Sequence, residues 1–341
     1  MTSPRSNTAA ARDLPAGNPS TSDSPIELGL NAAIVMVRHQ QPQVLAVRPG
    51  IAGEDLSDAL PFGPFVPRAH RTLEIGLREW VEQQTGIELG YVEQLYTFGD
   101  RGRHAEPGGA HTLSVGYLAL TRGATEEMRG AHWSPWYTYF PWEDWREGKP
   151  QILTEEIEPR LKAWAERPPS PGEHARPLRR PERLKIGFGI GGGWDEEKVL
   201  ERYELLYEAG LVAEAKRDGR SAANKWGALP KLGRPMTLDH RRILATAMGR
   251  VRGKLKYRPV VFELLPPEFT LYDLQKTVEA ISGTLLHKQN FRRLVEKGGL
   301  VEPTGNVSTE TGGRPARLYR FRGEVVLERP APGLRVKAGR S

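Results

Sequence analysis

The stretch FTLYDLQKTVEAISGTLLHKQNFRRLVEKGGLVEPTGNVSTETGGRPARLYRFR, residues 269–322, contains two helical patterns separated by a glycine and followed by two short β-rich runs. Thr270 and Asp273 have the spacing of a capping box, which predicts the start of the first helix. Gly283 is expected to end that helix. Its apolar stripe consists of Leu271, Leu274, Val278 and Ile281. Helix, glycine turn, helix and β-hairpin is the order of a winged helix-turn-helix.

The second helix, HKQNFRRLVEKG (287–298), is rich in cations and is expected to end at Gly298. At about 100° per residue, Phe291, Leu294 and Val295 share one face, and the polar side chains lie opposite or on the flanks. Arginine pairs with guanine, and asparagine or glutamine with adenine, so this face suits DNA. A solvated surface helix is the alternative. The candidate DNA-binding residues are Thr284, His287, Lys288, Gln289, Asn290, Arg292, Arg293 and Lys297, with Arg314 and Arg317 in or beside the glycine-rich tip of the hairpin.

The charge of the chain is unevenly distributed along its 341 residues. Residues 26–165 contain 13 lysines and arginines against 19 acidic residues, whereas residues 166–341 contain 34 against 21. A basic second half predicts a polyanionic partner, and double-stranded DNA fits the helix-turn-helix order. A basic linker with surface lysines would give the same balance without a partner.

Composition excludes several classes of protein. The chain has no cysteine, so disulfides and cysteine–zinc sites are excluded, and its eight histidines do not have zinc-site spacing. No apolar run approaches the roughly 18 residues of a membrane span, and the N-terminus lacks the apolar core of a signal peptide. We therefore expect a cytoplasmic protein with no membrane partner, a disordered tail over 1–25 and a second tail over 329–341.

The first half alternates strand and helix patterns, which predicts an α/β or α+β sandwich. Two β-rich runs, 31–38 and 43–48, predict a hairpin, and further strands are expected within 91–100 and 111–122. A helix over 70–86 has Gly86 as its C-cap and an apolar side formed by Leu73, Leu77, Trp80 and Val81. The predicted domains are 26–166, a Pro/Arg/Gly linker over 167–193, a helical connector over 194–236 with a helix from Asp195, and the winged helix over 237–328.

Several patterns are interpreted as structural. Gly187, Gly189 and Gly192 form G-x-G-x-x-G, but no βαβ unit surrounds them, so they are expected to be a flexible hinge. His240 is expected to be a structural helix residue. The aromatic segment predicts core and interface packing by Trp133, Trp136, Trp142 and Trp145.

Residues 259–305, PVVFELLPPEFTLYDLQKTVEAISGTLLHKQNFRRLVEKGGLVEPTG, resemble the C-terminal domain of the Nudix-like transcriptional regulators of NAD metabolism. Residues 60–104, LPFGPFVPRAHRTLEIGLREWVEQQTGIELGYVEQLYTFGDRGRH, resemble a Nudix domain. The length and the segments GYVEQLYTFGDRGRH and PWYTYFPWEDWR look closest to the NadQ-type branch, and NrtR-type regulators are shorter relatives. The resemblance implies a Nudix-like α/β/α sandwich followed by a winged helix-turn-helix. It also implies a homodimeric repressor of NAD-biosynthesis genes that binds a palindromic operator and is controlled by an adenine nucleotide.

The motif of Nudix hydrolases, G-x5-E-x7-R-E-U-x-E-E-x-G-U with U aliphatic, is degenerate in this chain. Alignment on Gly86 places Trp80, Gln83 and Gln84 where glutamates belong, and the upstream glutamate falls on Arg71. Alignment on Arg78 and Glu79 keeps Glu82 but misplaces the glycine. Because Mg²⁺ requires carboxylate ligands, we expect no metal site, no catalytic cofactor and no enzyme activity. The alternative is a hydrolase of an ADP-ribose-type substrate with a basic appendage.

The strand-loop-strand after this helix offers groups for binding a nucleotide. Aromatic faces stack on adenine, and arginines bind phosphates through two parallel hydrogen bonds. The effector would be ATP, NAD(H) or ADP-ribose. A core tyrosine and phenylalanine beside a solvated loop are the alternative interpretation. The candidate ligand-binding residues are Arg48, Tyr96, Phe98, Arg101, Arg103 and His111.

Overall fold

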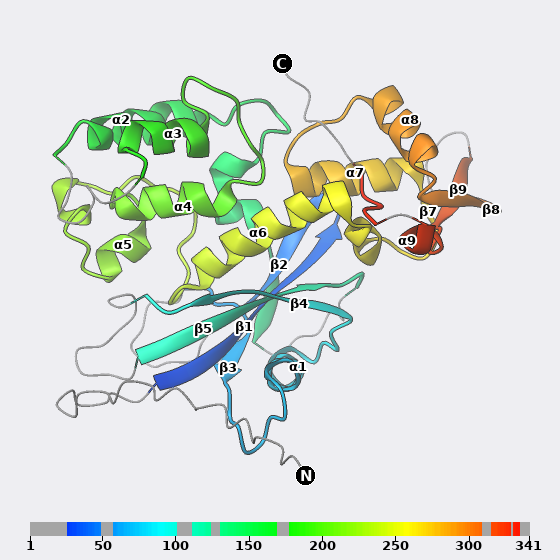
Figure 1. Cartoon of the computed structure of the whole chain (residues 1–341), viewed down its shortest axis with the longest axis horizontal. Helices are drawn as coiled ribbons and strands as arrows, with labels where there is room; N and C mark the ends of the chain where they lie inside the picture. The colour runs from blue at the N-terminus through cyan, green and yellow to red at the C-terminus, as the bar shows by residue number, and fades with distance from the viewer. Residues whose placement is uncertain are drawn as a thin grey trace, which may run out of the picture.

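The computed structural model describes residues 26–48, 57–100, 111–123, 130–168, 177–308, 315–328 and 330–334. The predicted tail 1–25 lies outside these residues. The first half contains a mixed sheet with strand order β4-β5-β1-β2-β6, and β3 pairs with β1 at its side (Figure 1). β1 and β5 are parallel, and the other neighbours are antiparallel. The strands are β1 (Ile26–Arg38), β2 (Gln41–Val47), β3 (Phe62–Pro64), β4 (Tyr91–Phe98), β5 (His111–Leu120) and β6 (Ala131–Pro135).

β1 and β2 form the predicted hairpin, with Val35 opposite Val44. The connection is two residues long, and both His39 and Gln40 have positive φ, 50° and 58°. This is the backbone of a type I′ turn, whose twist matches that of the strands it joins. The hairpin forms although neither turn residue is glycine, because β1 is buried in the middle of the sheet.

Helices cover both faces of this sheet, which confirms the predicted α/β/α sandwich. Alternate β1 residues point to opposite faces: Leu30, Ala32 and Ile34 pack with α1 (Leu73–Thr85), whereas Ala33 and Val35 belong to the larger core that includes α6 (His240–Tyr257). Figure 1 shows α6 crossing the sheet diagonally on the face opposite α1. α6 therefore supplies a layer of the sandwich, although the sequence placed it within the winged-helix range.

The first helix confirms the predicted cap, since Gly86 takes the left-handed conformation with φ 70° and its N–H bonds to Glu82 O at 2.7 Å. His240, at the start of α6, is structural as predicted: it is 1% exposed, and its Nδ1 accepts from the Leu60 backbone N–H at 3.0 Å. The aromatic segment also forms core, with Trp136 and Trp142 fully buried in two short 3-10 turns, Trp136–Thr138 and Pro141–Glu143.

The predicted linker 167–193 is partly helical, which corrects the expectation for its second half. α2 (Glu158–Ala165), preceded by a π-helical turn, is followed by α3 (Arg180–Phe188), whose Leu184 and Phe188 are buried. Gly189 ends α3 with φ 64°, and a Cβ there would lie 2.7 Å from the Gly193 carbonyl oxygen. The glycine motif is therefore an ordered helix end rather than a flexible hinge.

The connector contains α4 (Val199–Glu208), α5 (Ala213–Arg217) and a 3-10 turn, Ala223–Lys225. α4 begins four residues after the predicted Asp195, because the Asp195 carboxylate accepts from the Glu197 N–H at 3.0 Å and holds a turn.

Asp58, 3% exposed, is a buried acid that accepts from Tyr139 Oη at 2.7 Å and from Arg234 Nη1 of the connector at 2.9 Å. Burial raises the pKa of Asp58, but these two hydrogen bonds and nearby positive charge outweigh it and lower the pKa below 3.8.

The C-terminal part has the predicted order of a winged helix-turn-helix. α7 (Leu271–Ser282) begins at the predicted capping box, with Thr270 Oγ1 accepting from the Asp273 N–H at 3.1 Å, and its apolar stripe is buried. Gly299, with φ 56°, ends the next helix, so Gly298 is its last residue rather than its cap. The remaining elements are a 3-10 turn (Val260–Leu264), β7 (Phe269–Thr270), α8 (Lys288–Gly298), β8 (Val301–Ser308), β9 (Ala316–Phe321) and α9 (Val325–Glu328).

Part of the predicted C-terminal tail is docked on the fold. Leu334 is 2% exposed, and its backbone N–H bonds to Leu255 O near the end of α6 at 2.7 Å. Among the described residues, no helix is both long and apolar enough to cross a lipid bilayer.

Candidate nucleic-acid interface and effector site

α8 buries its apolar face and exposes its cations, as the periodicity predicts. Phe291 is 3% exposed and Val295 is fully buried. Lys288, Arg292, Arg293 and Lys297 are all exposed, together with Gln289 and Asn290. Within the described part of the chain, no carboxylate lies within ion-pair distance of these four cations. The face therefore presents charge and hydrogen-bond donors that are available to a polyanion.

The turn between α7 and α8 is fixed by a buried carboxylate. Glu279, 2% exposed, accepts from the Leu286 N–H at 3.0 Å and from Gln275 Nε2 at 2.8 Å, and it pairs with Lys276 at 2.8 Å. Gln275 Nε2 also donates to Leu286 O at 3.0 Å. Sequence reasoning missed both residues, although polar side chains on an apolar helix face were the available signal. They fix the turn from which α8 departs.

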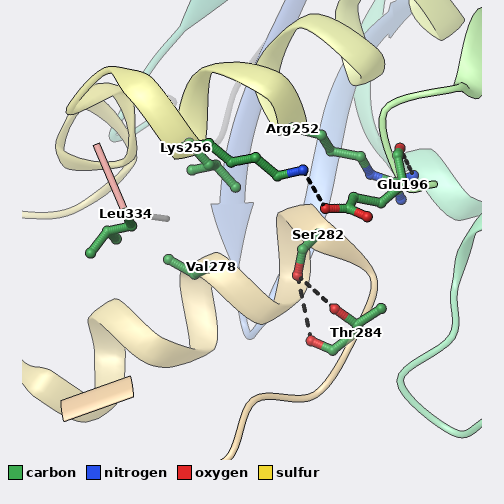
Figure 2. Close-up of a pocket in the computed structure, with 8 residues that line it drawn as sticks. Glu196, Arg252, Lys256, Val278, Ser282, Thr284 and Leu334 are labelled. Atoms are coloured by element: carbon green, nitrogen blue, oxygen red, sulfur yellow. Dashed lines mark hydrogen bonds and ion pairs between the residues drawn. The ribbon is translucent and has the colours of Figure 1, made fainter. Parts of the chain in front are cut away.

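The other candidate DNA contacts lie at the two ends of this unit. His287 is exposed and forms the N-cap of α8. Thr284 lies in the turn, hydrogen-bonded to Ser282, and lines a small pocket below Lys256 and Arg252 of α6 (Figure 2). Arg317 is exposed on β9, opposite Val307 of β8. Arg314 and the rest of the hairpin tip, 309–314, lie outside the described residues.

The degenerate Nudix helix uses two of its altered positions to hold β3. A Cβ on Gly63 would lie 2.2 Å from the Trp80 ring, and Trp80 Nε1 donates to Pro64 O at 2.9 Å. The Gln84 amide forms two hydrogen bonds with the Phe62 backbone, donating to its carbonyl oxygen and accepting from its N–H at 3.2 Å. An amide can donate and accept at once, whereas the ionised carboxylate of a glutamate can only accept. The described residues contain no cluster of three histidine, aspartate or glutamate side chains suited to a metal ion.

The predicted effector residues are only partly brought together. Tyr96 is 61% exposed on β4, whereas Phe98 is 2% exposed. The Phe98 ring packs against Tyr96, and the Arg242 guanidinium lies over it at 4.8 Å. Phe98 therefore belongs to the core under α6, which corrects its assignment as an adenine-stacking residue.

Arg48 is exposed at the end of β2, and β5 and β1 separate that strand from β4. Three strand spacings separate β2 from β4 by about 14 Å, so only an extended ligand would contact both Arg48 and Tyr96. His111 opens β5 opposite Ile26. Arg101 and Arg103 lie outside the described residues.

Comparison with known proteins agrees with this architecture. Residues 261–321 match the NrtR DNA-binding winged helix domain. Over 86 residues the chain is 42% identical to the ADPR responsive transcriptional repressor NtrR of Acinetobacter baylyi. That alignment covers 25% of this chain and 34% of the relative, so the chain spans about a third of the length of the curated relative it matches.

Two solved structures share the fold over most of the chain. Shewanella oneidensis NrtR in complex with a 27mer DNA is 20% identical, with a TM-score of 0.53 over 88% of this chain and 95% of that one. Shewanella oneidensis NrtR without DNA is 19% identical, with a TM-score of 0.52 over 87% of this chain and 95% of that one.

The structure and these comparisons define a Nudix-like sandwich followed by a winged helix-turn-helix, whose residues 261–321 match a DNA-binding winged helix domain. The predicted resemblance to the Nudix-like regulators is thereby confirmed at the level of the NrtR type. A closer likeness to the NadQ-type branch stays a prediction.

Proposed function

We propose that this chain is a transcriptional repressor that binds double-stranded DNA through α8 and responds to an adenine nucleotide through its Nudix-like half. One observation carries the proposal. The exposed cations of α8, which have no ion-pair partner among the described residues, lie within the segment that matches a DNA-binding winged helix domain. The genes it controls would be those of NAD biosynthesis, as the family resemblance implies.

The exposed side chains of α8 would make two kinds of contact with DNA, to base edges and to phosphates. Arg293 and Gln289, opposite the buried Phe291 face, would contact base edges in the major groove, because their donor patterns match guanine and adenine. Lys288 and Lys297, near the two helix ends, would bind phosphates. We propose that two copies bind a palindromic operator whose half-sites are about one helical turn, 34–36 Å, or a multiple of it apart.

ADP-ribose is the effector we propose, with ATP and NAD(H) as the alternatives. The Acinetobacter baylyi relative is named as ADPR-responsive, which supports ADP-ribose. Arg48 and Tyr96, separated by two strands, suit a ligand with a nucleoside at one end and a sugar phosphate at the other. Arg101, Arg103 and His111 would complete the site, with the arginines binding the diphosphate.

We further propose that the Nudix-like half does not catalyse hydrolysis. Trp80 and Gln84, at positions where the motif has glutamates, are committed to the backbone of β3. Mg²⁺ prefers carboxylate oxygens, and Glu79, which the other register places at a glutamate position together with Glu82, lies 3.5 Å from the buried His70. The competing function is a hydrolase of an ADP-ribose-type substrate with a basic appendage.

One paired experiment separates the two functions. The full chain is mixed with DNA of its own promoter in a gel-shift assay, with and without ADP-ribose, ATP or NAD. AMP release from ADP-ribose with Mg²⁺ is measured on the same preparation. We expect a shifted complex that one nucleotide alters, and no turnover at about 1 s⁻¹ or faster. Turnover without a shifted complex would overturn the repressor proposal.

A further inference from the structure

The C-terminal end of α7 is held by groups from outside the winged helix. The last carbonyls of a helix have no partner within the helix. Here Tyr137 Oη donates to Ala280 O at 2.7 Å, Arg252 Nε donates to Ile281 O at 2.9 Å, and the Trp145 N–H donates to Gly283 O at 2.7 Å. Tyr137 and Trp145 belong to the aromatic segment after β6, and Arg252 belongs to α6. We call these three contacts the α7 anchor.

A buried carboxylate organises the anchor. Glu143, Arg202 and Arg252 are all essentially inaccessible to solvent, at 0%, 0% and 1% exposed. Glu143 accepts from Arg202 Nε at 2.6 Å and Nη2 at 2.8 Å, and from Arg252 Nη1 at 2.7 Å. Burial raises the pKa of Glu143, but the two arginines outweigh it and hold the pKa below its usual value. Since a buried ion pair is stable only with well-matched partners, this cluster tolerates few arrangements.

Glu143 and Tyr137 pack directly against Gly283, where the turn of the helix-turn-helix begins. Gly283 has φ 73°, and a Cβ there would lie 2.4 Å from Glu143 O and 2.9 Å from Tyr137 Oη. Figure 2 shows Arg252 reaching from α6 above this end of α7, beside Ser282 and Thr284. The following turn is fixed by Glu279, whose carboxylate accepts from the Leu286 N–H. A displacement of the end of α7 would therefore move α8.

The residue that follows the anchor residue Trp145 contacts the sheet of the Nudix-like half. Arg146, next to the anchor residue Trp145, donates to Gln40 O at 2.8 Å and to Gln41 Oε1 at 2.9 Å, at the turn between β1 and β2. α7 itself contacts β1 and β2. The β1–β2 turn is thus linked to the start of α8, the reading helix, through these hydrogen bonds and the backbone segments between them.

We propose that Tyr137 and Arg252 are positioning residues that set the orientation of α8 relative to the Nudix-like half and carry the effector response to it. The inference rests on the proposed repressor function. Because only one separation of two reading helices matches successive major grooves, a small rotation at the anchor changes DNA affinity.

Two arginines of the same cluster provide a matched test. Arg252→Lys loses hydrogen bonds to both Glu143 and α7. Arg202→Lys loses hydrogen bonds to Glu143, and among the described residues Arg202 forms no hydrogen bond with α7. Tyr137→Phe is a milder third variant, since it removes only the hydroxyl that donates to Ala280 O. Each variant is compared with wild type for thermal unfolding, promoter-DNA affinity and the ratio of affinities with and without ADP-ribose.

We expect Arg202→Lys to lower the unfolding temperature and keep the affinity ratio within about twofold of wild type. Arg252→Lys and Tyr137→Phe should change that ratio by about fivefold or more, because each variant loses a hydrogen bond that links α7 to the Nudix-like half. If Tyr137→Phe folds and responds as wild type does, the positioning role is wrong. If wild type itself binds no promoter DNA, the repressor proposal fails first, which is a distinct result.

Discussion

Gln84 provides a direct test of why the Nudix-like helix lacks a metal site. Its amide donates to Phe62 O and accepts from Phe62 N–H, so it pairs α1 with β3. Gln84→Glu restores a motif carboxylate but removes the donor and places a negative charge beside a carbonyl oxygen. Gln83→Glu, one residue away, adds the same charge at an exposed position and is the matched control.

The expected cost of Gln84→Glu follows from these contacts. Losing one hydrogen bond and leaving a partly buried carbonyl without that donor costs about 1–3 kcal/mol. Both variants add an anion near the C-terminal end of α1, which costs a further 0.3–1 kcal/mol or so in each. The difference between the variants therefore isolates the pairing with β3. Below about pH 4 the carboxyl of Gln84→Glu is protonated and can donate again, so this difference should shrink.

Denaturant unfolding of the two variants and wild type measures the difference, and AMP release from ADP-ribose with Mg²⁺ is followed on the same samples. We expect Gln84→Glu to be less stable than Gln83→Glu by about 1–3 kcal/mol at pH 7 and to gain no turnover. Equal stabilities, or hydrolysis gained by Gln84→Glu alone, would refute the pairing role.

Three further predictions concern the reading helix, the turn and acid stability. Arg293→Ala should weaken operator binding by about 1–3 kcal/mol and reduce the discrimination between bases at particular positions, measured with operators that carry single-base changes. Unchanged discrimination would mean that α8 is a solvent-exposed surface helix that does not contact bases. Gly283→Ala should cost more unfolding free energy than Gly86→Ala, because both have positive φ but only Gly283 has backbone within 2.4 Å of the new Cβ; equal costs would contradict the close packing. The pKa of Asp58 is lower in the folded than in the unfolded chain, so Asp58 stabilises the fold above pH 3.8, and this stabilisation is lost as pH falls through the folded pKa. In Asp58→Asn the free energy of unfolding should therefore fall less steeply between neutral and acid pH than in wild type. An equally steep fall would show that Asp58 does not stabilise the fold in this way.

The features that the sequence predicted well are local in the chain. The capping box at Thr270, the left-handed Gly283 and the apolar stripe of α7 all depend on residues within one or two turns. The same holds for the β1–β2 hairpin and for the division of α8 into a buried and a cationic face.

The features it missed depend on residues far apart in the chain. Phe98 is core because α6, more than a hundred residues later, packs on its strand. Glu143 pairs with Arg202 and Arg252 across separations of 59 and 109 residues, and no periodicity marks such pairs. The sequence did not predict α3 because the surrounding residues are rich in proline and arginine, although Leu184 and Phe188 of this helix are buried in the core. Degeneracy of the Nudix motif was visible in the sequence, but the pairing of Gln84 with β3 was not.

The most direct test of the central claim is a fluorescence-anisotropy titration of promoter DNA with the full chain, with and without saturating ADP-ribose. We expect one saturable complex whose Kd changes by about 5–150-fold when ADP-ribose is present. Binding to promoter DNA no tighter than to unrelated DNA, or a Kd that ADP-ribose leaves unchanged, would contradict an effector-controlled repressor.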